Sequence, residues 1–336
     1  SGTHYISMAK KTLGRAGQWI SWVVFLLLLY ALMSAYITGG GAIVRNVMSL
    51  HGVTLAPWQS DVPWIVVFAI IIYLGPLLTD LLNRLLMLGL IVSYAAMGAS
   101  ATPHLHMSNL LTGTLHWHSI LIALPILLAS FGYHIVLPSM RTYLKSDVPK
   151  LRRMVLFGSL LPLVMYVLWI LLVFGVVSQQ GDNGLLAILK SGEPTDLLTR
   201  TLSHLSGDPW LGRVARFFAF FAIASSFVGV SLCLFDLLSD GLKVKRNHLG
   251  RSFIALLTFV PPLLFACFYP DGFLFALGYA GVFVAVLHGI LPAAMVWSGR
   301  YHLKLSSAYR VIGGRLALII VFLISLLVIY AQVVTH

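Results

Sequence analysis

The feature that most constrains this chain is a set of long stretches that contain no Asp, Glu, Lys or Arg. Of its 336 residues, 10% are charged and 59% are hydrophobic, whereas a soluble domain is about 25% charged. A surface this apolar would aggregate in water, so the chain must be surrounded by lipid. The composition therefore excludes an ordinary cytosolic enzyme, a disordered chain and a secreted disulfide scaffold.

These uncharged stretches predict nine transmembrane helices, since one spanning helix needs about 20 apolar residues. The stretch 85–140 is long enough for two helices, and its middle, 102–118, is rich in His, Thr and Ser and indicates a loop. The other stretches supply one helix each: 16–44, 62–79, 154–181, 217–235, 252–270, 272–299 and 316–336. We therefore expect an all-α, polytopic membrane protein that forms a single domain over residues 1–336.

The basic residues predict the orientation of these helices. With the start of the chain in the cytoplasm, 17 of the 22 Lys and Arg residues lie inside and 5 outside, as the positive-inside rule requires. The C-terminus is then external. The net charge of +12 is explained by topology and by anionic lipid headgroups, so membrane lipid rather than nucleic acid is the expected partner.

The segment 178–209 is the only long external connection that this topology leaves. Glu193, Pro194 and Thr195 are a plausible helix start, and Leu198, Leu202 and Leu205 follow at helical spacing. We expect a short interfacial helix here, which would act either as a lid over the outer mouth or simply as a packed loop.

Motifs of soluble enzymes are absent from the sequence, which has no P-loop, dinucleotide-binding glycine pattern, HExxH or CxxC. Cys233 and Cys267 lie inside apolar runs, where packing is the simplest role. His104 and His106 have no acid or thiol nearby in sequence. We therefore expect no enzyme activity, no cofactor and no metal site.

One predicted span carries residues that do not suit a continuous helix. Pro125 and Pro138 flank the run Ser130-Phe131-Gly132-Tyr133-His134. A helix broken here would free backbone groups and two half-helix ends that can bind the charged groups of an amino acid. The alternative is a kink that only packs helices. Because the ordinary pKa of histidine lies near neutral pH, His134 is the candidate proton carrier; the alternative is a neutral histidine bonded to a backbone carbonyl.

Two further helices place polar groups at the same depth. Tyr30 and Ser34 are four residues apart and share a helix face. Ser225 and Ser226 lie mid-span beside Phe227. Small residues and serines also serve helix packing, so each cluster alone indicates packing, whereas three clusters at one depth favour a central pocket.

Several motifs together resemble one protein family, the bacterial aromatic amino acid permeases, which are tyrosine and tryptophan transporters of the amino acid–polyamine–cation superfamily. The resemblance covers nearly the whole chain. The stretches that support it are Ala9-Lys10-Lys11-Thr12-Leu13-Gly14-Arg15, the run from Ser130 to His134 followed by Pro138-Ser139, Phe235-Asp236, Phe268-Tyr269-Pro270 and Ala276-Leu277-Gly278-Tyr279-Ala280-Gly281.

The resemblance implies an eleven-helix protein with a five-plus-five inverted repeat, located in the bacterial inner membrane, in which this chain supplies helices three to eleven. Substrate would lie between family helices one, three, six and eight. Tyr30 and Ser34 fall on the third, residues 130–134 on the sixth, and residues 225–227 on the eighth. The first two family helices are absent from this chain, so that either the chain is incomplete and the full protein contains the pair, or it is a truncated form. Without this pair we expect no transport.

The expected function is proton-coupled symport of an aromatic L-amino acid, with tyrosine as the substrate. The charged groups would bind backbone at Gly132, and the ring would lie among Phe131, Tyr133 and Phe227. A hydroxyl of Ser34, Ser225 or Ser226 would select tyrosine. The alternatives are transport of tryptophan or of a small non-aromatic amino acid, and a channel or non-transporting scaffold; a channel needs a continuous file of polar residues, and the sequence shows clusters.

Overall fold

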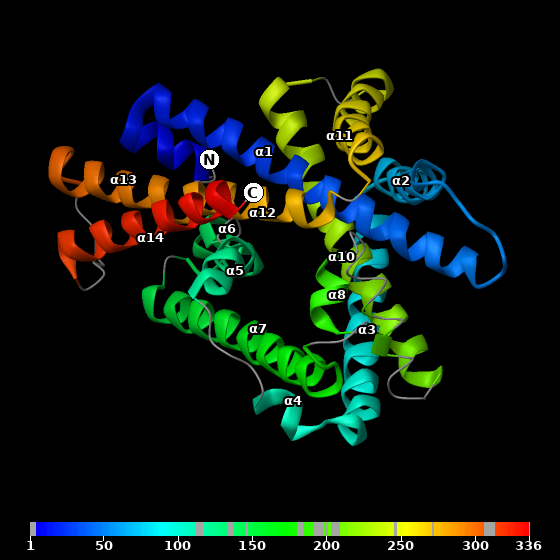
Figure 1. Ribbon diagram of the computed structural model, residues 1–336. Helices are drawn as coiled ribbons and strands as arrows, with labels where there is room; N and C mark the ends of the chain where they lie inside the picture. Colours follow the sequence, from blue (N-terminus) through cyan, green and yellow to red (C-terminus); the bar gives the residue numbers. More distant parts are fainter. Residues whose placement is uncertain are drawn as a thin grey trace. The chain divides into compact units, whose positions relative to one another are not determined.

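A computed structural model describes residues 5–111, 117–133, 137–145, 147–179, 184–190, 198, 201–202, 209–244, 247–270, 272–305 and 313–335. Within these ranges every regular element is a helix (Figure 1). Eight helical segments are long and apolar enough to cross a membrane. The prediction of an all-α, polytopic membrane protein is therefore confirmed.

Six of the eight segments consist of a single α-helix each: α1 (Tyr5–Ser49), α2 (Pro57–Leu74), α7 (Val148–Val176), α10 (Pro209–Leu242), α11 (His248–Phe268) and α14 (Gly314–Thr335). A further segment, Leu77–His104, consists of α3 (Pro76–Ala101) and the 3-10 turn η1 (Thr102–His104). The eighth, Phe273–His302, is built from α12 (Phe273–Ala285) and α13 (Leu291–Trp297), each followed by a π-helical turn, η3 (Val286–Ile290) and η4 (Ser298–His302). The ninth predicted span coincides with two short helices, α5 (Trp117–Ser130) and α6 (Leu137–Tyr143).

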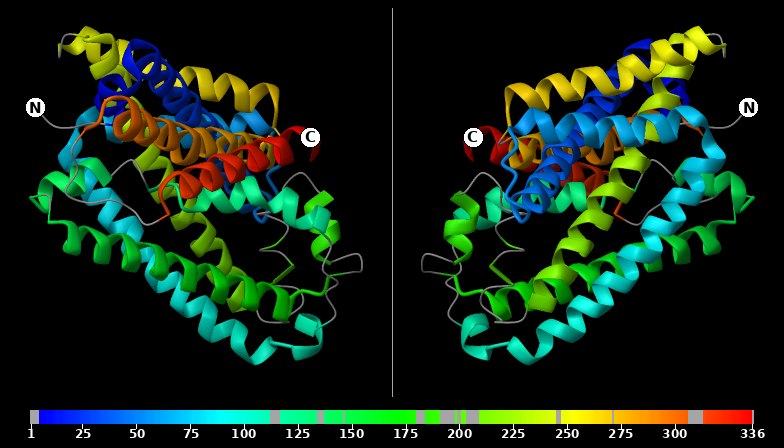
Figure 2. Two further views of the ribbon diagram at one scale, coloured as in Figure 1. Left: turned by 90° about the vertical axis from the view of Figure 1, so that its left-hand side faces the viewer. Right: turned by 90° about the vertical axis from the view of Figure 1, so that its right-hand side faces the viewer.

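The chain forms two compact units. The first unit contains residues 1–28, 115–166 and 277–336, and the second contains residues 29–114 and 167–276. In the first unit, α14 packs against α5, η3 and α13. In the second unit, α10 lies along α3 and also contacts α2 and α11, as Figures 1 and 2 show.

A kink at Gly14 divides α1, because this residue has a φ of 73°, a left-handed conformation that glycine adopts without strain. The helical arm before it, residues 5–13, contacts both π-helical turns of the first unit. The Tyr5 hydroxyl donates to the carbonyl of Leu287 at 2.6 Å, and the Ser298 hydroxyl donates to the carbonyl of Thr12 at 2.6 Å. The arm is therefore attached to this span at two points.

The core of the second unit includes part of the predicted external loop. Helix α8 (Leu185–Lys190) contributes Ile188, and Leu202 is fully buried in the same cluster. Their partners come from the ends of three long helices: Met97, Ala101, Val176, Val177, Leu211, Val214 and Ala215. The predicted helix start at residues 193–195 and Leu205 lie outside the described residues.

Asp147 caps the start of α7 and generates a prediction about pH. Its Oδ1 accepts from the backbone N–H of Lys150 at 3.1 Å, and its Oδ2 lies 3.1 Å from the Lys150 ammonium. The backbone hydrogen bond, and then the side chain of Lys150, hold the pKa of this carboxyl below its usual 3.8. Because the folded-state pKa is lowered, the stabilisation is present at neutral pH and is lost as the pH falls through the folded-state value.

We therefore expect Asp147→Ala to lower the melting temperature in detergent at neutral pH, and the difference from the wild type to shrink only as the pH falls below 3.8 and through the lowered folded-state pKa. Asp147→Asn is the control, because it keeps a capping oxygen without a charge. A gap for Asp147→Ala that stays constant down to pH 3 would contradict this role.

Candidate functional site

The helix interruption predicted from the sequence is present in the first unit. Helix α5 ends at Ser130, and residues 131–133 are not α-helical. Their N–H groups donate to carbonyls two or three residues back rather than four: Phe131 to Leu128 at 3.3 Å, Gly132 to Ala129 at 3.0 Å and Tyr133 to Phe131 at 2.9 Å. The interruption is confirmed over residues 131–133, whereas His134 lies outside the described residues.

Side chains of α7 hold this interruption. The hydroxyl of Tyr166 donates to the carbonyl of Ser130 at 3.0 Å, and its ring meets the ring of Phe131 edge-on at 5.6 Å. The hydroxyl of Tyr133 is hydrogen-bonded to Ser159. Sequence reasoning missed both α7 residues, although Ser159 and Tyr166 are seven residues apart and so share a helix face.

Close contact between α5 and α12 sets the position of the helix that leads into the interruption. A Cβ added at Gly281 of α12 would lie 2.2 Å from the carbonyl oxygen of Pro125, so only glycine allows this approach. One turn earlier, a Cβ at Gly278 would lie 2.5 Å from the amide of Gln332 on α14. Gly281 thus lets the backbones of α5 and α12 approach each other, and Gly278 makes room on α12 for the Gln332 side chain of α14.

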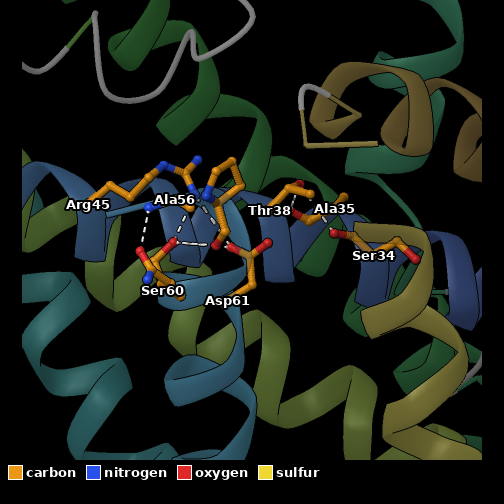
Figure 3. Close-up of polar contacts among 9 residues, drawn as sticks. Ser34, Ala35, Thr38, Arg45, Ala56, Ser60 and Asp61 are labelled. Carbon is orange, nitrogen blue, oxygen red and sulfur yellow. Dashed lines mark hydrogen bonds and ion pairs between the residues drawn. The ribbon is translucent and has the colours of Figure 1, made fainter. Parts of the chain in front are cut away.

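In the second unit, α1 presents a polar face. Tyr30, Ser34, Thr38, Gly41 and Arg45 follow at spacings of four, four, three and four residues, which places them on one side of the helix. The first four residues of this face bring hydroxyls or a bare backbone to the interior of the unit. The hydroxyl of Tyr30 donates to the Leu257 carbonyl at 2.8 Å, and that of Ser34 donates to the Tyr30 carbonyl at 2.9 Å. The hydroxyl of Thr38 donates to the Ala35 carbonyl at 3.0 Å (Figure 3).

The protons of Ser34 and Thr38 are therefore committed to carbonyls of α1 itself. Each hydroxyl oxygen keeps acceptor capacity, and both side chains are buried. What this face offers a ligand is hydrogen-bond acceptors rather than donors.

An ion pair ends this polar face. Nη1 of Arg45 lies 3.6 Å from Oδ1 of Asp61 and donates to the Ser60 hydroxyl at 2.8 Å (Figure 3). The Asp61 side chain is 1% exposed and that of Arg45 is 13% exposed. A Cβ at Gly41 would lie 1.7 Å from Oδ1 of Asp61, so the glycine makes room for the carboxylate. The sequence signal was available, since Arg45 and Asp61 are the charged residues that border the first two uncharged stretches.

Next to this pair lies an aromatic cluster that contains one of the predicted site residues. Phe227 is fully buried, with its ring centroid 5.4 Å from that of Phe68, 6.2 Å from Trp64 and 6.4 Å from Phe259. Trp64 fits against α1 at Gly40, where a Cβ would lie 2.2 Å from the indole. The Ser225 hydroxyl, also buried, donates to the Ala222 carbonyl at 3.2 Å.

The predicted site residues thus divide between the units. Ser130, Phe131, Gly132 and Tyr133 belong to the first, and Tyr30, Ser34, Ser225, Ser226 and Phe227 belong to the second. Within the second unit, Phe227 is connected to α1 through Trp64. The common pocket that we expect from the sequence stays a prediction.

The membrane-length helices define a multi-pass membrane protein, and an interruption such as that at residues 131–133 is a feature found in secondary transporters. Residues 1–332 match the tryptophan/tyrosine permease family. The chain belongs to this family, whose members are transport proteins rather than enzymes.

Three relatives illustrate the range of the similarity. The tyrosine-specific transport system 1 of Haemophilus influenzae is 34% identical over 324 residues, covering 96% of this chain and 79% of the relative. The tryptophan-specific transport protein of Pseudomonas aeruginosa is 30% identical, covering 96% and 78%. The low affinity tryptophan permease of Escherichia coli K12 is 31% identical, covering 98% and 80%.

The contact between Gly281 and Pro125 generates a prediction. We expect Gly281→Ala to destabilise the protein by about 1–3 kcal/mol, because the added methyl group meets backbone that cannot yield without moving α5. The measurement is thermal unfolding in detergent. Gly158→Ala on α7 is the matched control, since nothing lies within 4 Å of its Cβ position. Equal melting temperatures for the two variants would show that α5 does not depend on this approach.

Proposed function

We propose that this protein takes up tyrosine across the bacterial inner membrane by symport with a proton. The observation that supports this most directly is the helix interruption at residues 131–133 in a member of the tryptophan/tyrosine permease family. Tyrosine is favoured over tryptophan because the tyrosine-specific relative has the higher identity, 34% against 30% and 31%.

The interruption is suited to the charged groups of an amino acid. All three N–H groups of residues 131–133 already donate to carbonyls, so a substrate carboxylate would have to replace one of these bonds. The weakest is that of Phe131, at 3.3 Å. The substrate ammonium group would bind carbonyl oxygens, which can accept a second hydrogen bond. The rings of Phe131 and Tyr133 supply apolar contact for the substrate ring.

The second unit supplies the proposed determinants of specificity. The oxygens of Ser34 and Ser225 are acceptors, because their protons are donated to carbonyls at 2.9 and 3.2 Å. A phenolic hydroxyl donates to such an oxygen, whereas phenylalanine leaves it without a partner. Ser226 and the aromatic cluster around Phe227 complete the proposed contacts, and His134 is the proton carrier that the sequence suggests.

A tryptophan transporter is the second candidate, favoured by the tryptophan-specific relatives. An indole N–H can donate to the same serine oxygens. The two candidates are separated by measuring which of the two amino acids, tyrosine or tryptophan, competes better for the same uptake process.

The test is radiolabelled tyrosine uptake into proteoliposomes that contain the full-length protein. We expect saturable uptake that requires an inward proton gradient, with tyrosine competing better than tryptophan or phenylalanine and with no competition by serine or threonine. Protein-free liposomes and a protonophore are the controls. Uptake that is not saturable, or that is unaffected when the gradient is collapsed, would rule out the proposal.

A further inference from the structure

The buried ion pair of the second unit has no part in the substrate contacts described above. We propose that Asp61 is the residue that takes up the transported proton, and that Arg45 is the charged partner that holds it ionised between transport cycles. This inference rests on the proposed proton-coupled function and assigns the residue that performs the coupling.

The first argument is burial. Placing an ionised carboxylate and a guanidinium inside a membrane protein is costly, and such groups there mark ion and substrate pathways by default. The Asp61 side chain is 1% exposed and that of Arg45 is 13% exposed. Two other ion pairs of the described residues, Asp80–Arg84 and Asp147–Lys150, are much more exposed; in the first, at 2.8 Å, the side chains are 59% and 76% exposed.

The second argument is that the geometry supports both protonation states of Asp61. The 3.6 Å between Nη1 of Arg45 and Oδ1 of Asp61 is longer than the roughly 2.7–2.9 Å of a strong charge-assisted hydrogen bond. Arg45 is bound more closely to the Ser60 hydroxyl, at 2.8 Å, and that hydroxyl donates its own proton to the Pro57 carbonyl at 2.7 Å. When Asp61 is neutral, Arg45 therefore keeps a partner.

The third argument is that a change at Asp61 reaches the aromatic cluster through direct contacts. Oδ1 of Asp61 occupies the place where a Cβ of Gly41 would lie, and Trp64, one turn later on α2, occupies the corresponding place at Gly40. The Trp64 ring lies 6.2 Å from that of Phe227. Protonation that shifts Asp61 against α1 therefore moves α2 relative to the α10 residues 225–227.

Among the described residues, the guanidinium of Arg45 forms an ion pair with Asp61 at 3.6 Å, and the Ser60 hydroxyl lies 3.5 Å from the same carboxylate oxygen. On α11, the thiol of Cys267 interacts electrostatically with the carboxylate of Asp61. On α10, the residues that contact Trp64 are Phe220 and Phe227, and the nearest charge in sequence is Arg216. On α3, Asp80 and Arg84 pair with each other at the surface.

The proposed step is a simple proton transfer. A proton from water on the outer side binds a carboxylate oxygen of Asp61, which becomes a neutral acid and releases the attraction to Arg45. After substrate movement, the proton leaves to water on the inner side and the ion pair forms again. Because the substrate is a neutral zwitterion, each cycle moves one positive charge inward.

The test compares wild type with Asp61→Asn, both full-length, in proteoliposomes. A pH difference of one unit supports an accumulation ratio of about tenfold for one proton. We expect the wild type to accumulate tyrosine in response to this difference, and Asp61→Asn to equilibrate tyrosine without accumulation while it still exchanges internal for external tyrosine. Asp80→Asn is the matched control, because its carboxyl group is exposed to solvent, and it should accumulate like the wild type.

A second variant tests whether a loss of transport in Asp61→Asn results from misfolding. Asp61→Asn removes one charge of the Arg45–Asp61 pair, whereas the double variant Arg45→Gln/Asp61→Asn removes both charges together. If Asp61→Asn fails to exchange tyrosine, exchange and accumulation are measured for the double variant instead. Exchange without accumulation by the double variant supports the proposal.

Accumulation at the wild-type level in either variant overturns the assignment of Asp61 and leaves His134 as the candidate carrier. Tyrosine exchange without gradient-driven accumulation in the wild type itself overturns proton coupling as a whole, so the two failures are distinguishable.

Discussion

Backbone hydrogen bonding is the constraint on which this structure depends, because a bilayer offers no water to replace a missing partner. The chain departs from regular helix at residues 131–133, and the surrounding residues compensate. Short-range bonds use the N–H groups, and Tyr166 of α7 donates to the carbonyl of Ser130. A neighbouring helix thus takes over part of the hydrogen bonding at the interruption.

In both units, glycine residues allow polar groups to lie close to a helix backbone. Gly281 admits the carbonyl of Pro125, and Gly41 admits the carboxylate of Asp61. In each case a side chain would occupy the space that the polar group fills. Helix packing and polar chemistry are thus connected, since a larger residue at either position would displace the polar group as well as separate the helices.

The sequence predicted the helical class, eight of the spans and the position of the helix interruption, because lipid imposes length and composition on spans and the mixture at Ser130–His134 does not suit a continuous helix. It did not predict Tyr166, Ser159 or the pairing of Arg45 with Asp61. These depend on which helices are neighbours, and apolar periodicity carries little of that information when lipid surrounds the helices. Phe227 was predicted as a residue of the substrate site, and its packing with Phe68 and Trp64 depends on tertiary contacts of the same kind.

The arm before Gly14 has a mechanical consequence. Its hydroxyl and carbonyl contacts join it to both wide turns of the Phe273–His302 span, while Lys10 and Lys11 on the same arm are exposed. Anionic headgroups attract such lysines. An attraction of these lysines to the bilayer surface would therefore act on the π-helical turns at Leu287 and Ser298 through the two hydrogen bonds of the arm.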